Sequence, residues 1–109
     1  MPEAANIQPG TLEMLLLKVL SVQPEHGWGI GQRLQEASRG VFDVNPGSLY
    51  PALQRLLAKG WIRSEWRMTD SNREARYYQL TRSGRARLLR ERAGWERQVE
   101  AVAWVLRWT

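Results

Sequence analysis

Cysteine is absent from this sequence of 109 residues, and histidine occurs only once. Without cysteine the chain can form neither a disulfide framework nor a thiolate metal site. No apolar run approaches the roughly 20 residues needed to span a bilayer, and the N-terminus lacks the basic and apolar regions of a signal peptide. We therefore expect a cytoplasmic protein with no membrane-spanning segment and no metal site.

The side chains that most often serve as catalytic bases and nucleophiles are scarce. The single histidine, His26, is expected to fix the turn before a helix. Glu96 and Glu100 are four residues apart, but in an arginine-rich segment this spacing is typical of ion pairs on a helix surface. The glycines of residues 27–31 follow no strand and precede no Lys-Ser or Lys-Thr pair, so they indicate close helix packing rather than a phosphate-binding loop. We expect neither enzyme activity nor a cofactor.

Positive charge is abundant. The chain has 16 lysines and arginines against 11 aspartates and glutamates, which gives a formal net charge of +5. With 43% hydrophobic and 25% charged residues it is typical of a globular protein, and its length allows one domain. The charge balance favours a polyanionic partner such as nucleic acid.

A helix is predicted over residues 46–59, with both of its ends marked in the sequence. Asn45 can accept a hydrogen bond from a free N–H group of the first turn, and Pro46 fits the first helical position. Gly60 fits the left-handed residue that follows a helix. One face is apolar, formed by Leu49, Leu53, Leu56 and Leu57. The opposite face is small, polar and cationic, as a DNA major groove requires; it carries Ser48, Pro51, Gln54, Arg55 and Ala58.

A β-hairpin is predicted directly after this helix. Residues 61–68 alternate as a half-buried strand, whose buried face would hold Ile62, Ser64, Trp66 and Met68. Residues 69–73 are polar and turn-rich, and residues 74–80 return as a second strand. The tip and its flanks could contact the DNA backbone or the minor groove through Asn72, Arg73 and Arg76; the alternative is a merely solvated turn. A helix followed by such a wing is the winged helix-turn-helix arrangement.

The preceding residues complete this small domain. Residues 1–10 predict a flexible arm, and Thr11 would cap a mostly buried helix that ends near Val22. A second helix is expected over residues 28–38. Residues 41–44 are β-prone and could form a third strand at the root of the wing, with the core side chains Phe42 and Val44. The predicted fold is therefore mainly α with a small β-hairpin (α+β).

The last segment, residues 81–109, predicts a long helix capped by Thr81. Its apolar residues recur as a near-heptad seam, interrupted at Arg92 and formed by Leu88, Trp95, Val99, Val102 and Leu106. A helix of about 27 residues would reach roughly 40 Å, beyond the small domain of residues 11–80. Its free seam would bury against a second copy across a two-fold axis. The alternative is a helix folded back onto its own domain.

Several motifs together resemble the PadR family of bacterial transcriptional regulators. The matching residues are His26-Gly27-Trp28-Gly29-Ile30, Pro46 to Leu53 with Arg55-Leu56, Lys59-Gly60-Trp61-Ile62, Arg76-Tyr77-Tyr78, Leu80-Thr81 and Gly84. The resemblance implies a winged helix-turn-helix domain, a C-terminal dimerisation helix and repression of an adjacent gene. The single C-terminal helix resembles the compact subfamily, and Trp28 stands where tyrosine is more usual.

The resemblance places the helix of residues 46–59 in the major groove. Its expected DNA contacts are Ser48, Tyr50, Pro51, Gln54 and Arg55. Gln54 can pair with adenine, and Arg55 with guanine or a phosphate. For Tyr50 the alternative is that its ring packs on the core and only its hydroxyl reaches a phosphate. A homodimer would place two such helices about 34 Å apart on double-stranded DNA, which predicts an inverted-repeat operator.

The tryptophans of the C-terminal helix raise a further alternative. Two copies of Trp95, with Val99 beside them, could form flat walls for a small aromatic effector at the dimer interface. The other interpretation is that Trp95, Trp104 and Trp108 only pack the dimer. A pure oligomerisation module would explain this helix but not the basic wing.

Overall fold

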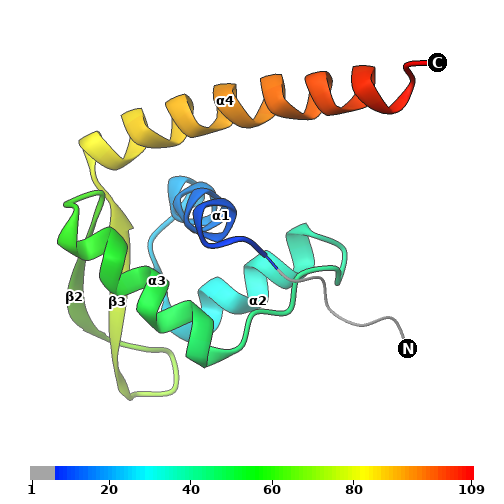
Figure 1. Ribbon diagram of the computed structural model, residues 1–109. Coiled ribbons are helices and arrows are strands. Elements are labelled where there is room, and N and C mark those ends of the chain that lie inside the picture. Colours follow the sequence, from blue (N-terminus) through cyan, green and yellow to red (C-terminus); the bar gives the residue numbers. More distant parts are fainter. Residues whose placement is uncertain (1–6) are drawn as a thin grey trace.

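The computed structural model describes residues 7–109 and shows a helical body with a small sheet at one side (Figure 1). The elements in chain order are α1 (Pro9–Val22), β1 (Glu25–His26), α2 (Gly27–Ala37), α3 (Pro46–Ala58), β2 (Ile62–Met68), β3 (Glu74–Leu80) and α4 (Arg82–Leu106). The predicted α+β class and winged-helix arrangement are confirmed. Residues 1–6 of the predicted arm lie outside the described residues.

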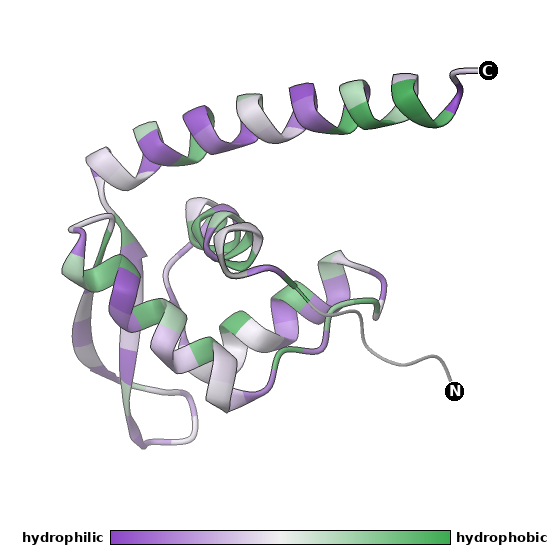
Figure 2. Cartoon of the chain, viewed as in Figure 1, coloured by the Kyte–Doolittle hydropathy of each residue, from purple (hydrophilic) through white to green (hydrophobic). Residues whose placement is uncertain are grey.

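The core forms around α1, which packs against α2, α3 and α4 (Figure 1). Its apolar residues recur so closely that most of its circumference is buried. The largest fully buried side chains come from α1, α2 and α3; they are Leu16, Leu17, Ile30, Leu53 and Leu56. Helix α4 crosses α1 with its first half and then continues outward, and its last turns are among its most hydrophobic (Figure 2).

The sheet has the strand order β1-β3-β2, and all pairs are antiparallel. The register of the hairpin runs from Ile62 opposite Leu80 to Met68 opposite Glu74. The predicted third strand over residues 41–44 is wrong, because β1 occupies the free edge of β3 instead, with Glu25 opposite Tyr78. Phe42 and Val44 nevertheless pack against the core as expected.

The predicted N-caps of α3 and α4 are confirmed, and His26 fixes the start of α2 as expected. The Asn45 Oδ1 atom accepts the N–H of Ser48 at 3.0 Å at the start of α3, and Gly60 follows that helix with φ +72°. At the start of α4, the hydroxyl of Thr81 accepts the N–H of Gly84 at 3.1 Å. His26 begins α2 through its Nδ1 atom, which accepts the N–H of Gly29 at 3.1 Å. These side chains satisfy N–H groups that have no partner within their helix.

The start of α1 differs from the prediction. The helix begins at Pro9, with Gln8 as its N-cap residue, so Thr11 does not cap it. The N–H of Leu12 already donates to the Gln8 carbonyl oxygen at 2.9 Å. Proline needs no N–H partner at the first position, so the helix starts there without a side-chain cap.

The burial of β2 also differs from the prediction. Of the face expected to be buried, Ile62 is only 2% exposed, whereas Trp66 is 67% and Met68 57% exposed. The strand alternates as expected, but it extends beyond the helices that cover its first residues. Alternation defines two faces of a strand; whether a face is covered depends on how far the neighbouring elements reach.

Candidate nucleic-acid interface

The polar face of α3 is open to solvent over its whole length. The predicted contact residues on it are all exposed; they are Ser48, Tyr50, Pro51, Gln54 and Arg55. The opposite face anchors the helix through the buried residues Leu49, Ala52, Leu53 and Leu56. Pro51 lies inside the helix and faces outward. The helix therefore presents one rigid polar surface to the surroundings.

Arg55 forms an ion pair with Glu13, a residue that the sequence analysis did not assign to this surface. Its Nε atom lies 2.7 Å from a carboxylate oxygen of Glu13 on α1, and Lys59 Nζ lies 4.0 Å from the other oxygen. The Glu13 side chain is largely buried, whereas the side chains of both cations are half exposed. Spacing along the chain gives no signal for this contact, because 42 residues separate Glu13 from Arg55.

Tyr50 lies at the junction of α3 with the start of α2. A Cβ atom built on Gly27 would lie 2.6 Å from the Tyr50 hydroxyl oxygen, so the ring packs directly on the Gly27 backbone. The side chain is still 42% exposed, so it is not a core residue. It lines a hollow with the start of α2 and with β3, which also involves His26, Trp28, Ala75, Arg76 and Tyr78.

Arg76 belongs to this hollow rather than to the hairpin tip. Its Nε atom donates to the Ser64 hydroxyl at 2.8 Å, and its guanidinium carbon lies 5.7 Å from the Tyr78 ring centroid. Burial raises the pKa of the Tyr78 hydroxyl, and this outweighs the opposing effect of the Arg76 charge. Arg76 therefore lies between the wing and α3, where it is partly buried.

Asn72 and Arg73 form the exposed tip of the wing. Asn72 has φ +61°, a left-handed conformation that asparagine tolerates better than most residues. The turn is closed by the N–H of Thr69, which donates to the Arg73 carbonyl oxygen at 2.7 Å. The Arg73 side chain is exposed. The three predicted wing residues thus divide between the tip of the hairpin and the middle of β3.

The seam of α4 is exposed beyond its first residue. Leu88 is 8% exposed and belongs to the core of its own chain, while the remaining seam residues are exposed: Trp95, Val99, Val102 and Leu106. The sequence seam did not include Trp104, Val105 and Trp108, which are exposed as well. The first part of α4 is thus folded onto its own domain, and the rest is not.

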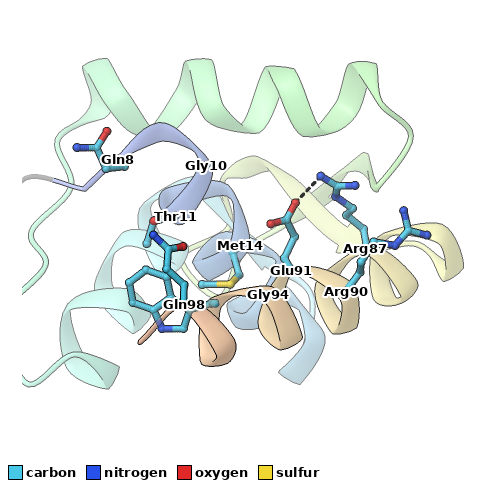
Figure 3. A pocket seen from close by; sticks show the side chains of 10 residues that line it. Gln8, Gly10, Thr11, Met14, Arg87, Arg90, Glu91, Gly94 and Gln98 are labelled. Carbon is cyan, nitrogen blue, oxygen red and sulfur yellow. Dashed lines mark ion pairs between the residues drawn. The ribbon is translucent and has the colours of Figure 1, made fainter. Parts of the chain in front are cut away.

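A groove of about 610 Å³ lies between the N-terminal turn of α1 and the middle of α4 (Figure 3). From α1 it is lined by Thr11 and Met14, and from α4 by Arg90, Gln98 and the exposed Trp95. Arg87 and Glu91, which also line it, form an ion pair (Figure 3). The groove therefore combines apolar walls with charged groups.

Two classes of site are not present in the described residues. Within residues 7–109, no group of three His, Asp or Glu side chains could hold a metal ion. Among the helices of the same range, none has both the length and the apolar composition that crossing a bilayer requires.

The elements α2, α3 and the β2–β3 hairpin have the arrangement of a winged-helix protein, and solved structures share it. A PadR family transcriptional regulator from Eggerthella lenta superposes with a TM-score of 0.80 at 29% identity, covering 92% of this chain and 85% of that one. A Streptococcus transcriptional regulator superposes with a TM-score of 0.78 at 28% identity, covering 88% and 92%.

Sequence comparison agrees with the structural one. Residues 16–90 match the transcriptional regulator PadR-like family. Over 68 residues the chain is 44% identical to the transcriptional regulator Rv3488 of Mycobacterium tuberculosis, covering 62% of this chain and 63% of that relative. The match thus spans less than two-thirds of that relative's length. The chain belongs to the PadR-like family of transcriptional regulators, as its motifs predicted.

Proposed function

We propose that this protein is a sequence-specific DNA-binding regulator, acting in the cytoplasm as a homodimer that represses transcription. The observation that supports this best is the exposed polar face of α3, which lies beside an arginine-bearing wing on a chain of net charge +5. A helix enters a major groove through such a face, and the wing contacts the neighbouring backbone. A dimer seated on a promoter would exclude RNA polymerase from it.

Within this proposal, residues of α3 specify sequence and residues of the wing position the protein. Gln54 has a side-chain amide that can pair bidentately with adenine. Ser48 and Tyr50 lie in the first turns of α3, where their hydroxyls can donate to phosphates or base edges. At the wing, Arg73 and Asn72 reach outward from the tip, and Arg76 lies closer to α3.

The exposed part of the α4 seam supports the homodimer. Its four apolar side chains follow one side of the helix, and a second copy would bury them across a two-fold axis. Two α3 helices would then face the same side of a duplex. Their expected separation of about 34 Å corresponds to one turn of DNA, so the operator would be an inverted repeat.

Binding to random duplex DNA at low salt tests the proposal against a pure oligomerisation module. We expect binding that weakens steeply with salt, because arginine contacts release counterions from phosphates. Duplexes selected from a random pool should then share an inverted repeat. Gln54→Ala should relax specificity at one base pair of each half-site by about 1–3 kcal/mol. A protein that forms dimers but binds no duplex would contradict the proposal.

A second candidate function is regulation by a small aromatic effector. The groove between α1 and α4 supports it, because it places the exposed Trp95 within reach of a ligand and near the proposed dimer seam, where Val99 follows one turn later. Titration with a planar aromatic dye should quench tryptophan fluorescence to saturation, and Trp95→Ala should abolish the signal. Absence of saturable quenching would leave these tryptophans with packing roles only.

A further inference from the structure

One face of the β2–β3 hairpin is buried in the core at its base and exposed to solvent toward its tip. At the base, Ile62 lies opposite Leu80 and is buried. Farther out on the same face, Trp66 lies opposite Arg76, and Met68 opposite Glu74. Trp66 and Met68 are 67% and 57% exposed, so no other part of residues 7–109 covers them. We call these two side chains the wing wedge.

The wing wedge adds little to the core, because both of its side chains are mostly exposed. The strand pair is held by its backbone hydrogen bonds and by the buried base, and small or polar residues are ordinary on the exposed part of a wing. Two adjacent large apolar side chains exposed on one strand face are informative, because they offer apolar area to a partner.

The position of Arg76 shows where this face points. Arg76 shares the face with Trp66, and it lines the same hollow as Tyr50 of α3. The wing wedge therefore lies on the side of the hairpin that is turned toward the exposed face of α3. Any duplex that contacts both α3 and the wing must pass along this side.

The charges around the wing wedge favour a polyanion. Arg76 lies directly across from Trp66 on the same face, and Arg73 is exposed at the tip. Arg67 lies on the opposite face, where its guanidinium carbon is 5.3 Å from the Tyr77 ring centroid. The nearby carboxylates are Glu74, opposite Met68, and Glu65, which is ion-paired with Arg67. Cations that flank apolar side chains match a minor groove, where sugar rings form apolar walls between two rows of phosphates.

We propose that Trp66 and Met68 pack into the DNA minor groove as an apolar wedge, while Arg73 and Arg76 hold the phosphates beside it. This inference rests on the proposed DNA-binding function and adds contacts that the arginines of the wing do not supply. The wedge contributes affinity by burying apolar area, so its contribution does not depend on counterion release.

A salt series separates the wedge from the arginines. Dissociation constants for a random duplex of about 30 base pairs are measured by fluorescence anisotropy across several salt concentrations, for the wild type, Trp66→Ala and Arg73→Ala. Trp66→Ala should weaken binding about tenfold with an unchanged salt slope, because it removes apolar burial alone. Arg73→Ala should lower the slope by about 1. Leu89→Ala, which removes an exposed apolar side chain of α4, serves as the matched control and should bind as the wild type does.

Two further measurements keep the test decisive. Thermal unfolding checks that Trp66→Ala folds. If it does not fold, two other variants replace it: Trp66→Phe should retain most of the affinity, and Met68→Ala should lose part of it. The salt slope should be unchanged in both. A minor-groove ligand such as distamycin should compete with the wild type more strongly than with the wedge variant.

The inference is wrong if the wedge variants bind duplex DNA as tightly as the wild type, even where transcriptional regulation is lost; that result would assign the wedge to a protein partner. It is also wrong if the wedge variants bind more weakly because the salt dependence of their binding is reduced, as expected for the loss of a phosphate contact. A wild-type protein that binds no duplex would instead overturn the proposed function itself, and the wedge with it.

Discussion

At the scale of single residues, the carboxylate of Glu13 pairs with two cations on the exposed face of α3. It lies 2.7 Å from Arg55 Nε and 4.0 Å from Lys59 Nζ, and it comes from α1, which packs behind α3. Arg55 was expected to contact DNA directly. In the structure it must exchange or share its carboxylate partner in order to do so, since one guanidinium edge already faces Glu13.

We predict that Glu13→Gln increases affinity for random duplex DNA. The change frees two partly exposed cations for phosphates, so the salt dependence should steepen by up to about 0.9 per new phosphate contact. Stability should change little, because pairs with half-exposed partners contribute about 0–1 kcal/mol. Fluorescence anisotropy in a salt series measures the effect, with Glu36→Gln as the control on an exposed position of α2. Equal affinity and slope for both variants would contradict this role of Glu13.

Glu25 on β1 is a buried carboxylate. Burial alone would raise the pKa of Glu25, but hydrogen bonds from Arg33 and Gln23 together with the Arg33 charge outweigh it and hold that pKa below its ordinary value. The Arg33 Nε atom lies 2.7 Å from the carboxylate, and a Cβ atom on Gly29 would overlap it. The carboxylate therefore fills the space beside the start of α2.

The lowered pKa of Glu25 predicts how stability depends on pH. The folded-state pKa of Glu25 lies below that of the unfolded chain, so between the two pKa values the unfolded chain binds more protons. The stabilising contribution of Glu25 is therefore complete above about pH 4.5. It is lost as the pH falls through the folded-state value. Glu25→Gln should be less stable at pH 7, and its stability should fall less steeply below about pH 4.5. Urea unfolding at several pH values tests this, and parallel pH profiles would contradict it.

At the scale of elements, the joint between α3 and α4 fixes the direction of the long helix. The Gly60 carbonyl oxygen accepts hydrogen bonds from the hydroxyls of Thr81 at 2.7 Å and Ser83 at 3.0 Å. The Trp61 ring lies between two cations, Lys59 Nζ at 4.8 Å and Arg87 Cζ at 4.7 Å from its centroid. These contacts join the end of α3 to the start of α4, so the two helices should move as one body.

Gly84 is the closest contact in this joint, because a Cβ atom there would overlap the Trp61 carbonyl oxygen. We predict that Gly84→Ala lowers the free energy of unfolding by about 1–3 kcal/mol, since backbone atoms would have to shift. Gly31→Ala is the matched control: its Cβ would meet only Leu49 Cδ2 at 3.9 Å, so it should gain up to about 1 kcal/mol through helix propensity. Urea unfolding measures both, and equal stability of the two variants would contradict the account of the joint.

The elements also show what local sequence could and could not predict. The caps of α3 and α4 were predicted correctly, because an N-cap side chain bonds a residue only three positions away. The strand β1 was missed, because two residues carry no periodicity and pair only through the distant β3. Of the candidate site, the exposed face of α3 was predicted from helical spacing. The pairing of Arg55 with Glu13 was not, since it depends on how α1 packs against α3.

At the scale of the whole molecule, α4 reaches beyond the body, and the molecule with α4 included measures 59 Å along its longest axis. The exposed part of its seam can be buried only by something outside the folded domain, and we propose a second copy. Leu88 lies in the monomer core, whereas every seam residue after it is exposed. The sequence predicted the seam but not this division, because apolar spacing is the same on both sides of it.

We predict that Val99→Asp disrupts the dimer, because it places a charge in the middle of a buried apolar seam. Sedimentation at micromolar concentration should show the mass of one chain for this variant and of two chains for the wild type. Ala86→Asp, at an exposed position on roughly the opposite side of α4, should leave the dimer intact. A wild type that sediments as a single chain would remove the basis for the two-fold arrangement.

We propose that two joined copies place their α3 helices on successive turns of one duplex. Hydroxyl-radical footprinting on a duplex selected from a random pool tests it most directly. We predict two protected segments of equal size, related by two-fold symmetry, with centres about 34 Å or roughly 10 base pairs apart. A single protected segment, or two segments repeated in the same orientation, would contradict it.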